Sequence, residues 1–519
     1  MFIRKDFLYI CAFLINNATC PAMFKTDFIQ NAKRLLSDEY EALETALSTD
    51  PPVSIRINPW KGNDIILPLM KGDNSQLLSG TKLSINAEWE RVPWCKTGYY
   101  LPERPVFTCD PLFHAGVYYV QEASSMFLEQ AILTIVSATI TTNHPVTALD
   151  LCAAPGGKST HLLSLLPENS LLVCNEVIRS RNLVLSENIA KWGRSNAIIT
   201  QNDPQHFGDR LPHFFDIILA DLPCSGEGLF RKEPAARNEW SMENVKMCAA
   251  RQRRIVRDAW EALKPGGYLI YSTCTFNTEE NEENIKTLSD ELGAEIIPIP
   301  VKPTWKVSGA LHHDMPAYRF FPYRTRGEGF FLALIKKTAT GDSRGQTKEG
   351  IQATGDKRRK SDDRRGKTGD KRQDFDIYKY LNVPSNSEIF LLQANNQAIA
   401  IPQKYKNTFS ALSERLNIRS AGLPLGEWKG ADFIPSAALA LSTELNPRAF
   451  PSIALSYEQA IAYLRKETII LPADAPKGHL LATFQNTPLG FIKNVGTRVN
   501  NLYPREWRIR GPRIYTNLR

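Results

Sequence analysis

The sequence predicts an α/β protein built on a mostly parallel, doubly wound sheet with helices on both faces. From about residue 101 to residue 337, short apolar runs rich in β-branched residues alternate with longer helical stretches. This alternation is typical of parallel sheets whose strands are joined by helices. The strand candidates are 146–150, 171–176, 197–200, 216–221, 268–273 and 330–337, and the helices are 158–166, 179–192 and 243–263.

Size and composition limit what else the chain can be. Its 519 residues are too many for a single hydrophobic core. Hydrophobic residues make up 43% of the chain and charged residues 23%, which is the ordinary composition of a globular protein. The net charge of +8 is compatible with a polyanionic partner but does not prove one. No apolar run approaches the roughly 20 residues that span a membrane. We therefore expect a cytoplasmic protein without a membrane segment.

Nine cysteines all lie at or before residue 274, with no CxxC pair and no Cys/His cluster at zinc spacing. An odd, uneven set in a large chain is typical of reduced thiols, so we expect neither disulfides nor a metal site.

The N-terminal part is predicted to hold an extension and a small α+β subdomain. Residues 1–22 have the outline of a signal peptide, but an upstream start codon explains them better, because Met23 opens an amphipathic segment. A helical pattern then covers 27–47, and 53–59 alternates as a strand. These elements define a subdomain at 23–100, ahead of the α/β domain at 101–337.

The C-terminal part is predicted to begin with a basic flexible linker at 338–373. That segment has no aromatic residue, so it cannot bury enough apolar surface to order itself. A small middle domain at 374–455 follows, with strand candidates at 388–393 and 397–402. Residues 456–519 form a last unit that ends in a stretch dense in arginine and aromatic residues.

A glycine loop follows the first strand of the α/β domain in ALDLCAAPGGKSTHLL (148–163). Glycines let the backbone turn sharply and let a ligand approach where a strand leads into a helix. A phosphate-binding P-loop would need glycine where Cys152 stands, and the GxGxxG of dinucleotide folds is absent. In isolation, an ordinary strand-to-helix turn would also fit.

Acidic residues at the following strand ends favour a nucleoside ligand. Glu176 ends the second strand, where a carboxylate can accept hydrogen bonds from a ribose diol. Asp203 follows the third strand, where it can hold an adenine amino group, and Asp221 ends the fourth. This combination suits S-adenosylmethionine better than NAD. The predicted cofactor residues are Cys152, Ala153, Ala154, Pro155, Gly156, Gly157, Lys158, Glu176, Asp203 and Asp221.

Two cysteines lie just beyond strand ends at the same edge. Cys224 stands in DLPCSGEGLFRK (221–232) and Cys274 in YSTCTFN (271–277). Free cysteine is usually a small buried hydrophobe, which we expect for Cys95, Cys152, Cys174 and Cys248. Cys224 and Cys274 instead have polar loop neighbours, where function concentrates.

The motifs PCSGEG (223–228), STCT (272–275) and DLCAAPGGK (150–158) together resemble the RNA (cytosine-5)-methyltransferases of the Fmu/Sun/Nop family. QEASSM (121–126) and residues 320–331 and 490–504 are similar more narrowly to its RsmF branch, which acts on small-subunit ribosomal RNA.

The resemblance implies a class I, Rossmann-like methyltransferase domain at 101–337, an RNA-binding subdomain at 23–100 and a PUA-like RNA-binding unit at 456–519. It also implies S-adenosylmethionine as cofactor and a cytosine of 16S ribosomal RNA, in the decoding region, as target. The small ribosomal subunit is then the expected partner of a monomeric enzyme. The first 22 residues and the linker depart from the family pattern.

Carbon 5 of cytosine needs activation before it accepts a methyl group, and a thiolate that adds to carbon 6 provides it. Asp221 is our candidate for protonating ring nitrogen 3 during this addition. Residue chemistry alone leaves the roles of the two cysteines nearly even. The resemblance implies Cys274 as the nucleophile and Cys224 as the base for product release.

RNA contacts are predicted at Lys158, Lys493, Arg498 and Arg505, the last three on short polar turns, although a solvated surface would also explain them. The target cytosine must be unpaired or flipped. Two alternatives remain: a class I methyltransferase acting on DNA or protein, and a non-catalytic RNA-binding assembly factor. Cys274 argues against DNA enzymes, and the intact acids and cysteines argue against the assembly factor.

Overall fold

The computed structural model describes residues 24–62, 89–139, 145–338, 376–382, 389–394, 396–430 and 432–510. The predicted extension 1–22, and the predicted linker 338–373 except Thr338, lie outside the described residues. No helix in the described part of the chain is long and apolar enough to cross a membrane.

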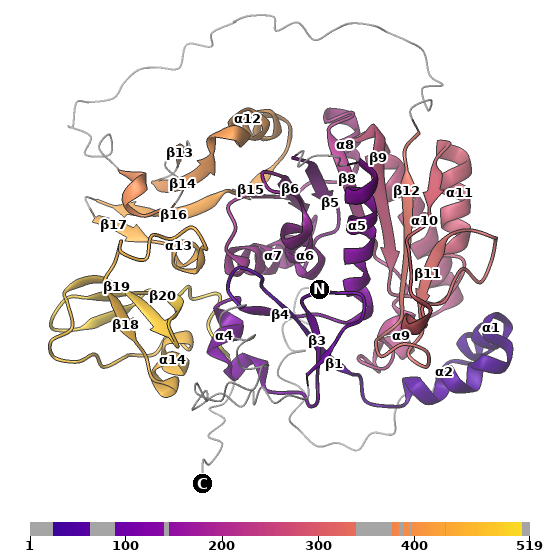
Figure 1. Ribbon diagram of the computed structural model, residues 1–519, viewed down its shortest axis with the longest axis horizontal. Helices are drawn as coiled ribbons and strands as arrows, with labels where there is room; N and C mark the ends of the chain where they lie inside the picture. The colour runs from indigo at the N-terminus through magenta and orange to yellow at the C-terminus, as the bar shows by residue number, and fades with distance from the viewer. Residues whose placement is uncertain are drawn as a thin grey trace, which may run out of the picture.

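A nine-stranded sheet forms the centre of the molecule (Figure 1). Its strand order is β10-β12-β9-β8-β5-β6-β7-β15, with β11 paired to β12. The five strands from β9 to β7 are parallel, and antiparallel strands complete both edges. This confirms the predicted α/β class. The strands are β5 (Thr147–Asp150), β6 (Leu171–Asn175), β7 (Ala197–Thr200), β8 (Phe215–Asp221), β9 (Leu263–Thr273), β10 (Glu295–Ile297), β11 (Ala317–Phe320), β12 (Phe330–Lys336) and β15 (Ile418–Ala421).

Helices cover both faces of this sheet because its strands are apolar on both sides. Ala148 packs into the hydrophobic cluster on one face, and its neighbour Leu149 packs into the cluster on the other. One face is covered by α5 (Leu128–Thr139), α6 (Gly157–Leu165) and α7 (Arg179–Trp192). The other is covered by α8 (Gln205–Arg210), α10 (Met242–Trp260), α11 (Glu282–Leu292) and α12 (Lys406–Arg415).

The N-terminal part adds a helix pair and a small sheet. In the first helix, Phe28, Ala32 and Leu36 recur at helical spacing and are buried, in one cluster with Phe230 and Trp240 of the α/β domain. The small sheet has the order β2-β3-β1-β4, so it takes residues from both sides of the expected boundary at residue 100. The elements are α1 (Thr26–Leu36), α2 (Tyr40–Leu47), β1 (Val53–Ile57), β2 (Glu90–Arg91), β3 (Gly98–Leu101), α4 (Pro111–His114) and β4 (Tyr118–Val120).

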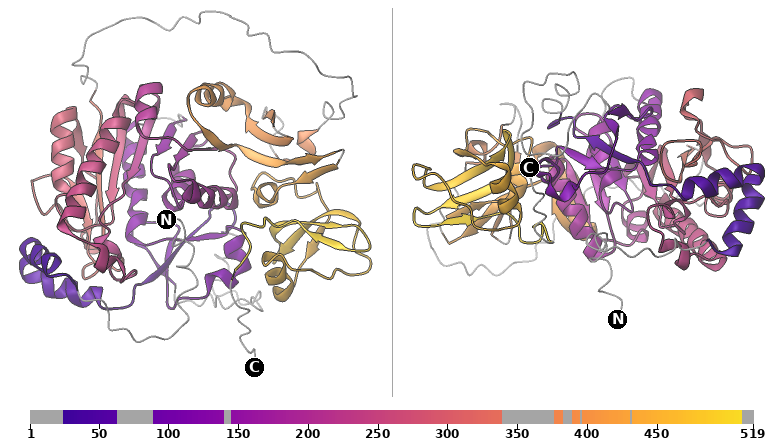
Figure 2. Two further views of the ribbon diagram at one scale, coloured as in Figure 1. Left: turned by 180° about the vertical axis from the view of Figure 1, so that it is seen from behind. Right: turned by 90° about the horizontal axis from the view of Figure 1, so that it is seen from below.

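Two further sheets lie on the side of the molecule opposite α1 and α2 (Figure 2). The first has the order β13-β14-β16-β17 and the second β18-β19-β20-β21. Strand β15, from the predicted middle domain, pairs instead with β7 of the central sheet. The domain boundaries themselves stay predictions. The elements are β13 (Ile389–Ala394), β14 (Gln397–Pro402), β16 (Leu423–Lys429), β17 (Asp432–Pro435), α13 (Ala437–Leu441), β18 (Ser452–Ala454), α14 (Tyr457–Leu464), β19 (Gly478–Phe484), β20 (Thr487–Asn494) and β21 (Val499–Asn501).

Candidate active site

The glycine loop between β5 and α6 is built as its sequence predicts. Gly156 is the residue before α6 and has a φ of 113°, a left-handed conformation that side chains disfavour. A Cβ there would also lie 3.3 Å from Asn188 Cβ and 3.4 Å from Leu185 Cδ1. The loop therefore requires glycine to pass this close to α7.

Asp150, at the end of β5, is a buried acid at the carboxyl edge of the sheet. Its Oδ2 accepts a hydrogen bond of 2.7 Å from Ser159 Oγ, while Oδ1 is buried and has no hydrogen-bond partner among the residues that the structure describes. Burial raises the pKa of Asp150 to about 7. S-adenosylmethionine carries an ammonium group that would satisfy such an oxygen, so the residue fits the predicted cofactor.

Glu176 and Asp203 both lie at the same edge but differ in exposure. Glu176 is buried; its Oε1 accepts from Ile178 N at 2.8 Å, and its Oε2 lies 3.2 Å from Arg181 Nη1. Arg181 also donates to Ala154 O at 2.8 Å, which joins the acid to the glycine loop. No motif in the sequence pointed to this arginine. Asp203 is exposed and accepts from the Gln205 amide.

Lys158 and Asp221 form an ion pair at the centre of this edge. Lys158 Nζ lies 2.8 Å from Asp221 Oδ2, and Ser272 Oγ donates to Asp221 Oδ1 at 2.7 Å. Burial alone would lower the pKa of Lys158, but the nearby Asp221 raises it above its usual value. The lysine therefore stays charged and points at Asp221.

The two predicted cysteines meet. Cys224 Sγ and Cys274 Sγ lie 3.2 Å apart, although the residues are 50 positions apart in the chain. The hydrogen bond with Cys274, followed by burial, raises the pKa of Cys224 well above its usual range. Cys224 is therefore a protonated thiol at neutral pH, in direct contact with its neighbour.

Two buried glutamates join the cysteine loops, and neither was predicted from the sequence. Glu280 accepts from Ser225 N at 3.0 Å and from Gln252 Nε2 at 2.7 Å. Glu227 accepts from the Phe276 and Asn277 amides at 2.7 and 2.8 Å. The only sequence feature that could have indicated these glutamates is their position near the cysteines. Glu227 follows Cys224 by three residues, and Glu280 follows Cys274 by six. These bonds fix the backbone on both sides of the cysteines.

The other predicted cysteines differ in burial. Cys152 is half-buried in the glycine loop, and burial followed by Asp150 raises its pKa. Cys95, Cys174 and Cys248 are buried, as expected of structural cysteines.

The predicted RNA contacts of the C-terminal unit are separate from this site. Arg498 and Arg505 are exposed on turns. Lys493 was expected on a turn but lies within β20, because the strand continues to Asn494, and it pairs with Asp432 at 2.8 Å.

Comparison with known proteins identifies related sequences over most of the chain. Residues 138–336 match the family model of 16S rRNA methyltransferase RsmB/F. Residues 24–123 match the N-terminal domain of 16S rRNA methyltransferase RsmF, and residues 450–509 match the methyltransferase RsmF PUA domain.

Individual relatives and one solved structure agree with these matches. Ribosomal RNA small subunit methyltransferase F of Cronobacter sakazakii is 32% identical over 80% of this chain and 84% of its own length. The protein of the same name from Salmonella heidelberg is 30% identical over 93% of this chain and 97% of its own. The crystal structure of PH0851 matches with a TM-score of 0.51 and 25% identity, over 60% of this chain and 66% of that one.

Proposed function

We propose that this chain, which belongs to the ribosomal RNA small subunit methyltransferase F family, methylates carbon 5 of a cytosine in 16S ribosomal RNA. The chain is an S-adenosylmethionine-dependent methyltransferase with a C-terminal domain of the PUA family. The finer assignment rests on one observation: two cysteine sulfurs 3.2 Å apart, at the sheet edge that carries the predicted cofactor residues.

The cofactor supplies an electrophilic methyl group on a sulfonium. We assign its ammonium to Oδ1 of Asp150, its ribose diol to Glu176 and its adenine amino group to Asp203. The glycine loop supplies the close backbone approach, with contacts from Cys152, Ala153, Ala154, Pro155, Gly156, Gly157 and Lys158, and Asp221 borders the same site.

The residues at the sheet edge divide the chemistry between them. The Cys274 thiolate adds to carbon 6 of the cytosine, which makes carbon 5 nucleophilic enough to take the methyl group. Asp221 carries the proton that Cys274 loses to ring nitrogen 3 during this addition, and takes it back when the ring double bond re-forms. Lys158 positions the Asp221 carboxylate through their 2.8 Å ion pair. Lys158 provides positive charge for the anionic RNA at the same place.

Product release needs a base, and Cys224 is placed to act as one. Cys224, a protonated thiol in the resting protein, first loses its proton to solvent. The thiolate then removes the proton from carbon 5, the electrons of that C–H bond re-form the ring double bond, and the bond from Cys274 Sγ to carbon 6 breaks. The products are 5-methylcytosine in RNA, S-adenosylhomocysteine and the free thiols of the enzyme. The 3.2 Å sulfur separation allows one target ring to be reached by both side chains.

The C-terminal unit is proposed to hold the RNA beyond the target base. Arg498 and Arg505 are exposed on one unit with Lys493, which suits contacts to phosphates. We further propose that the enzyme acts as a cytoplasmic monomer on RNA of the small ribosomal subunit, near the decoding region.

Trapping of the covalent intermediate tests the cysteine roles. We expect Cys274→Ala to form no RNA adduct on a denaturing gel. We expect Cys224→Ala to accumulate the adduct, because release fails. Cys248→Ala is the matched control, since this buried cysteine lies in α10 away from the pair. An adduct in Cys274→Ala, with none in Cys224→Ala, would reverse the assignment.

A further inference from the structure

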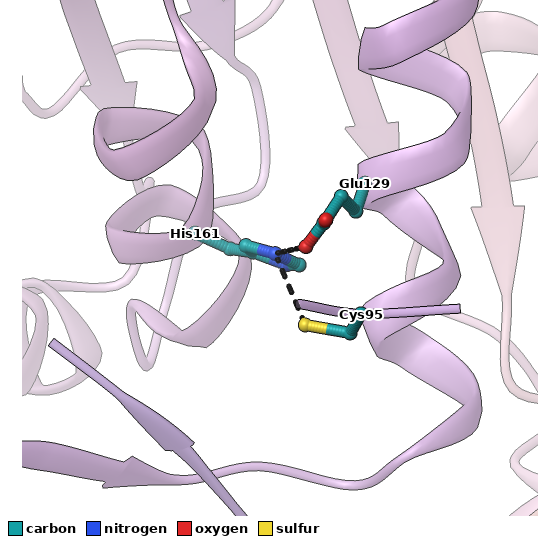
Figure 3. A group of neighbouring side chains, drawn as sticks. All are labelled: Cys95, Glu129 and His161. Atoms are coloured by element: carbon teal, nitrogen blue, oxygen red, sulfur yellow. Dashed lines mark hydrogen bonds and ion pairs between the residues drawn. The ribbon is translucent and has the colours of Figure 1, made fainter. Parts of the chain in front are cut away.

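Three further side chains that can bind metals meet inside the protein (Figure 3). Cys95 lies between β2 and β3, Glu129 on α5 and His161 on α6. Their exposed fractions are 3%, 2% and 0%. Each lies more than 30 positions from the next along the chain, so no local spacing in the sequence could predict the cluster.

The donor atoms of this cluster lie close enough together to surround one ion. His161 Nε2 lies 3.8 Å from Cys95 Sγ and 3.4 Å from Glu129 Oε2, and all three donor atoms lie within 4.8 Å of one another. An N–H···O hydrogen bond is usually about 2.7–3.2 Å, so the one between the imidazole and the carboxylate is long. Ligands held at about 2.0–2.3 Å from a tetrahedral zinc ion are separated by roughly 3.3–3.7 Å.

We propose that Cys95, Glu129 and His161 bind a zinc ion, with water as the fourth ligand. Thiolate, imidazole and carboxylate are all donors that zinc accepts. One thiolate and one carboxylate offset the two positive charges of the ion itself.

The neighbouring groups fit this assignment. Glu129 is oriented by the Lys96 amide, at 3.2 Å from Oε1. The nearby Arg56 guanidinium is directed to Gln121 Oε1 at 2.8 Å and Thr160 Oγ1 at 2.6 Å.

The ion would join the small N-terminal sheet to the cofactor helix. His161 follows Lys158 by three residues on α6, so one turn separates the zinc ligand from the active-site lysine. The zinc is therefore assigned a structural role: it holds α6, and the glycine loop before it, against the loop of Cys95. This role does not depend on which base the enzyme methylates.

Metal content tests the proposal directly. We expect untagged full-length protein from zinc-supplemented cells to contain about one zinc per chain, and Cys95→Ala to contain less than about a tenth of that. Replacement of zinc by cobalt(II) should give a thiolate-to-cobalt charge-transfer band that Cys95→Ala lacks. The zinc content and the cobalt band of the wild-type protein test the proposal even if Cys95→Ala folds poorly.

A second cluster at the surface provides the control. Glu283, His312 and His313 also lie within metal-binding distance of one another, but they are partly exposed and include no cysteine. His312→Gln/His313→Gln should keep both the zinc and the cobalt band. Wild-type protein that contains no zinc and gives no thiolate–cobalt band would overturn the proposal and leave a hydrogen-bonded cluster only. Zinc that is lost in the double histidine variant, but kept in Cys95→Ala, would overturn it equally.

Discussion

At the scale of single residues, Asp150 is buried, and its Oδ1 accepts no hydrogen bond from any described residue. The protonation of Asp150 should therefore control cofactor binding. Only the carboxylate attracts an ammonium group, and burial raises the pKa of this acid to about 7. We therefore expect S-adenosylmethionine to bind about 25-fold more weakly near pH 5.5 than near pH 7.5, because less of the protein is ionised at Asp150. The range stops below the α-amino pKa of about 8, where the ligand itself loses its charge.

Calorimetric titration of wild type and two variants would measure this dependence. Asp150→Asn should bind weakly with a flat pH profile. Asp110→Asn removes another buried acid, whose pKa burial raises to about 6, but Asp110 lies at α4 and should leave the profile unchanged. A flat profile in the wild type would show that Asp150 does not face the cofactor.

The active-site residues that the sequence predicts are those that follow strand ends. Cys224, Cys274 and Asp221 each stand at or just past the end of a parallel strand, so the sheet alone brings them to one edge. Glu227 and Glu280 could not be assigned in this way. Each accepts hydrogen bonds from the other cysteine's loop, and that pairing exists only when two loops about 50 residues apart have packed.

At the scale of elements, strands with long apolar runs were predictable and short edge strands were not. All six strand candidates of the α/β domain are confirmed, because each apolar run is buried on both faces. β15 was missed, since only one of its four residues is buried and its partner β7 precedes it by more than 200 residues. Sequence patterns report burial, whereas edge pairing depends on a partner far along the chain.

Substitution of Gly422, directly after β15, should destabilise the protein more than substitution of Gly430, which has a similar backbone conformation. Its φ is 57°, and a Cβ would lie 2.3 Å from Ala400 O; Gly430 has a φ of 64°, and a Cβ there would have no described atom within 4 Å. We expect Gly430→Ala to cost about 1 kcal/mol of stability and Gly422→Ala about twice that or more. Hydrogen exchange should show faster opening of β7 amides only in Gly422→Ala. Equal exchange in both variants would mean that β15 does not depend on this turn.

At the scale of the whole molecule, the C-terminal unit is joined to the N-terminal sheet by a shared core. Ile55 and Ile57 of β1 belong to the same hydrophobic cluster as Tyr463 and Leu464 of α14. Tyr457 also donates to Cys109 O at 2.9 Å. Deleting residues 456–519 would expose this core, so loss of RNA binding in such a truncation would not identify an RNA contact. Substitution of exposed arginines avoids this problem.

Arg498→Gln/Arg505→Gln should therefore weaken RNA binding without unfolding the protein. Removing one cation that pairs with a phosphate reduces the slope of log affinity against log salt by about one, so we expect the slope to fall by about two. Fluorescence anisotropy with an RNA fragment at several salt concentrations would measure it. Lys286→Gln/Lys302→Gln removes the same charge from exposed positions of the methyltransferase domain and should keep the wild-type slope. If both double variants lowered the slope by the same amount, the net charge of the protein, and not the C-terminal unit, would set the salt dependence.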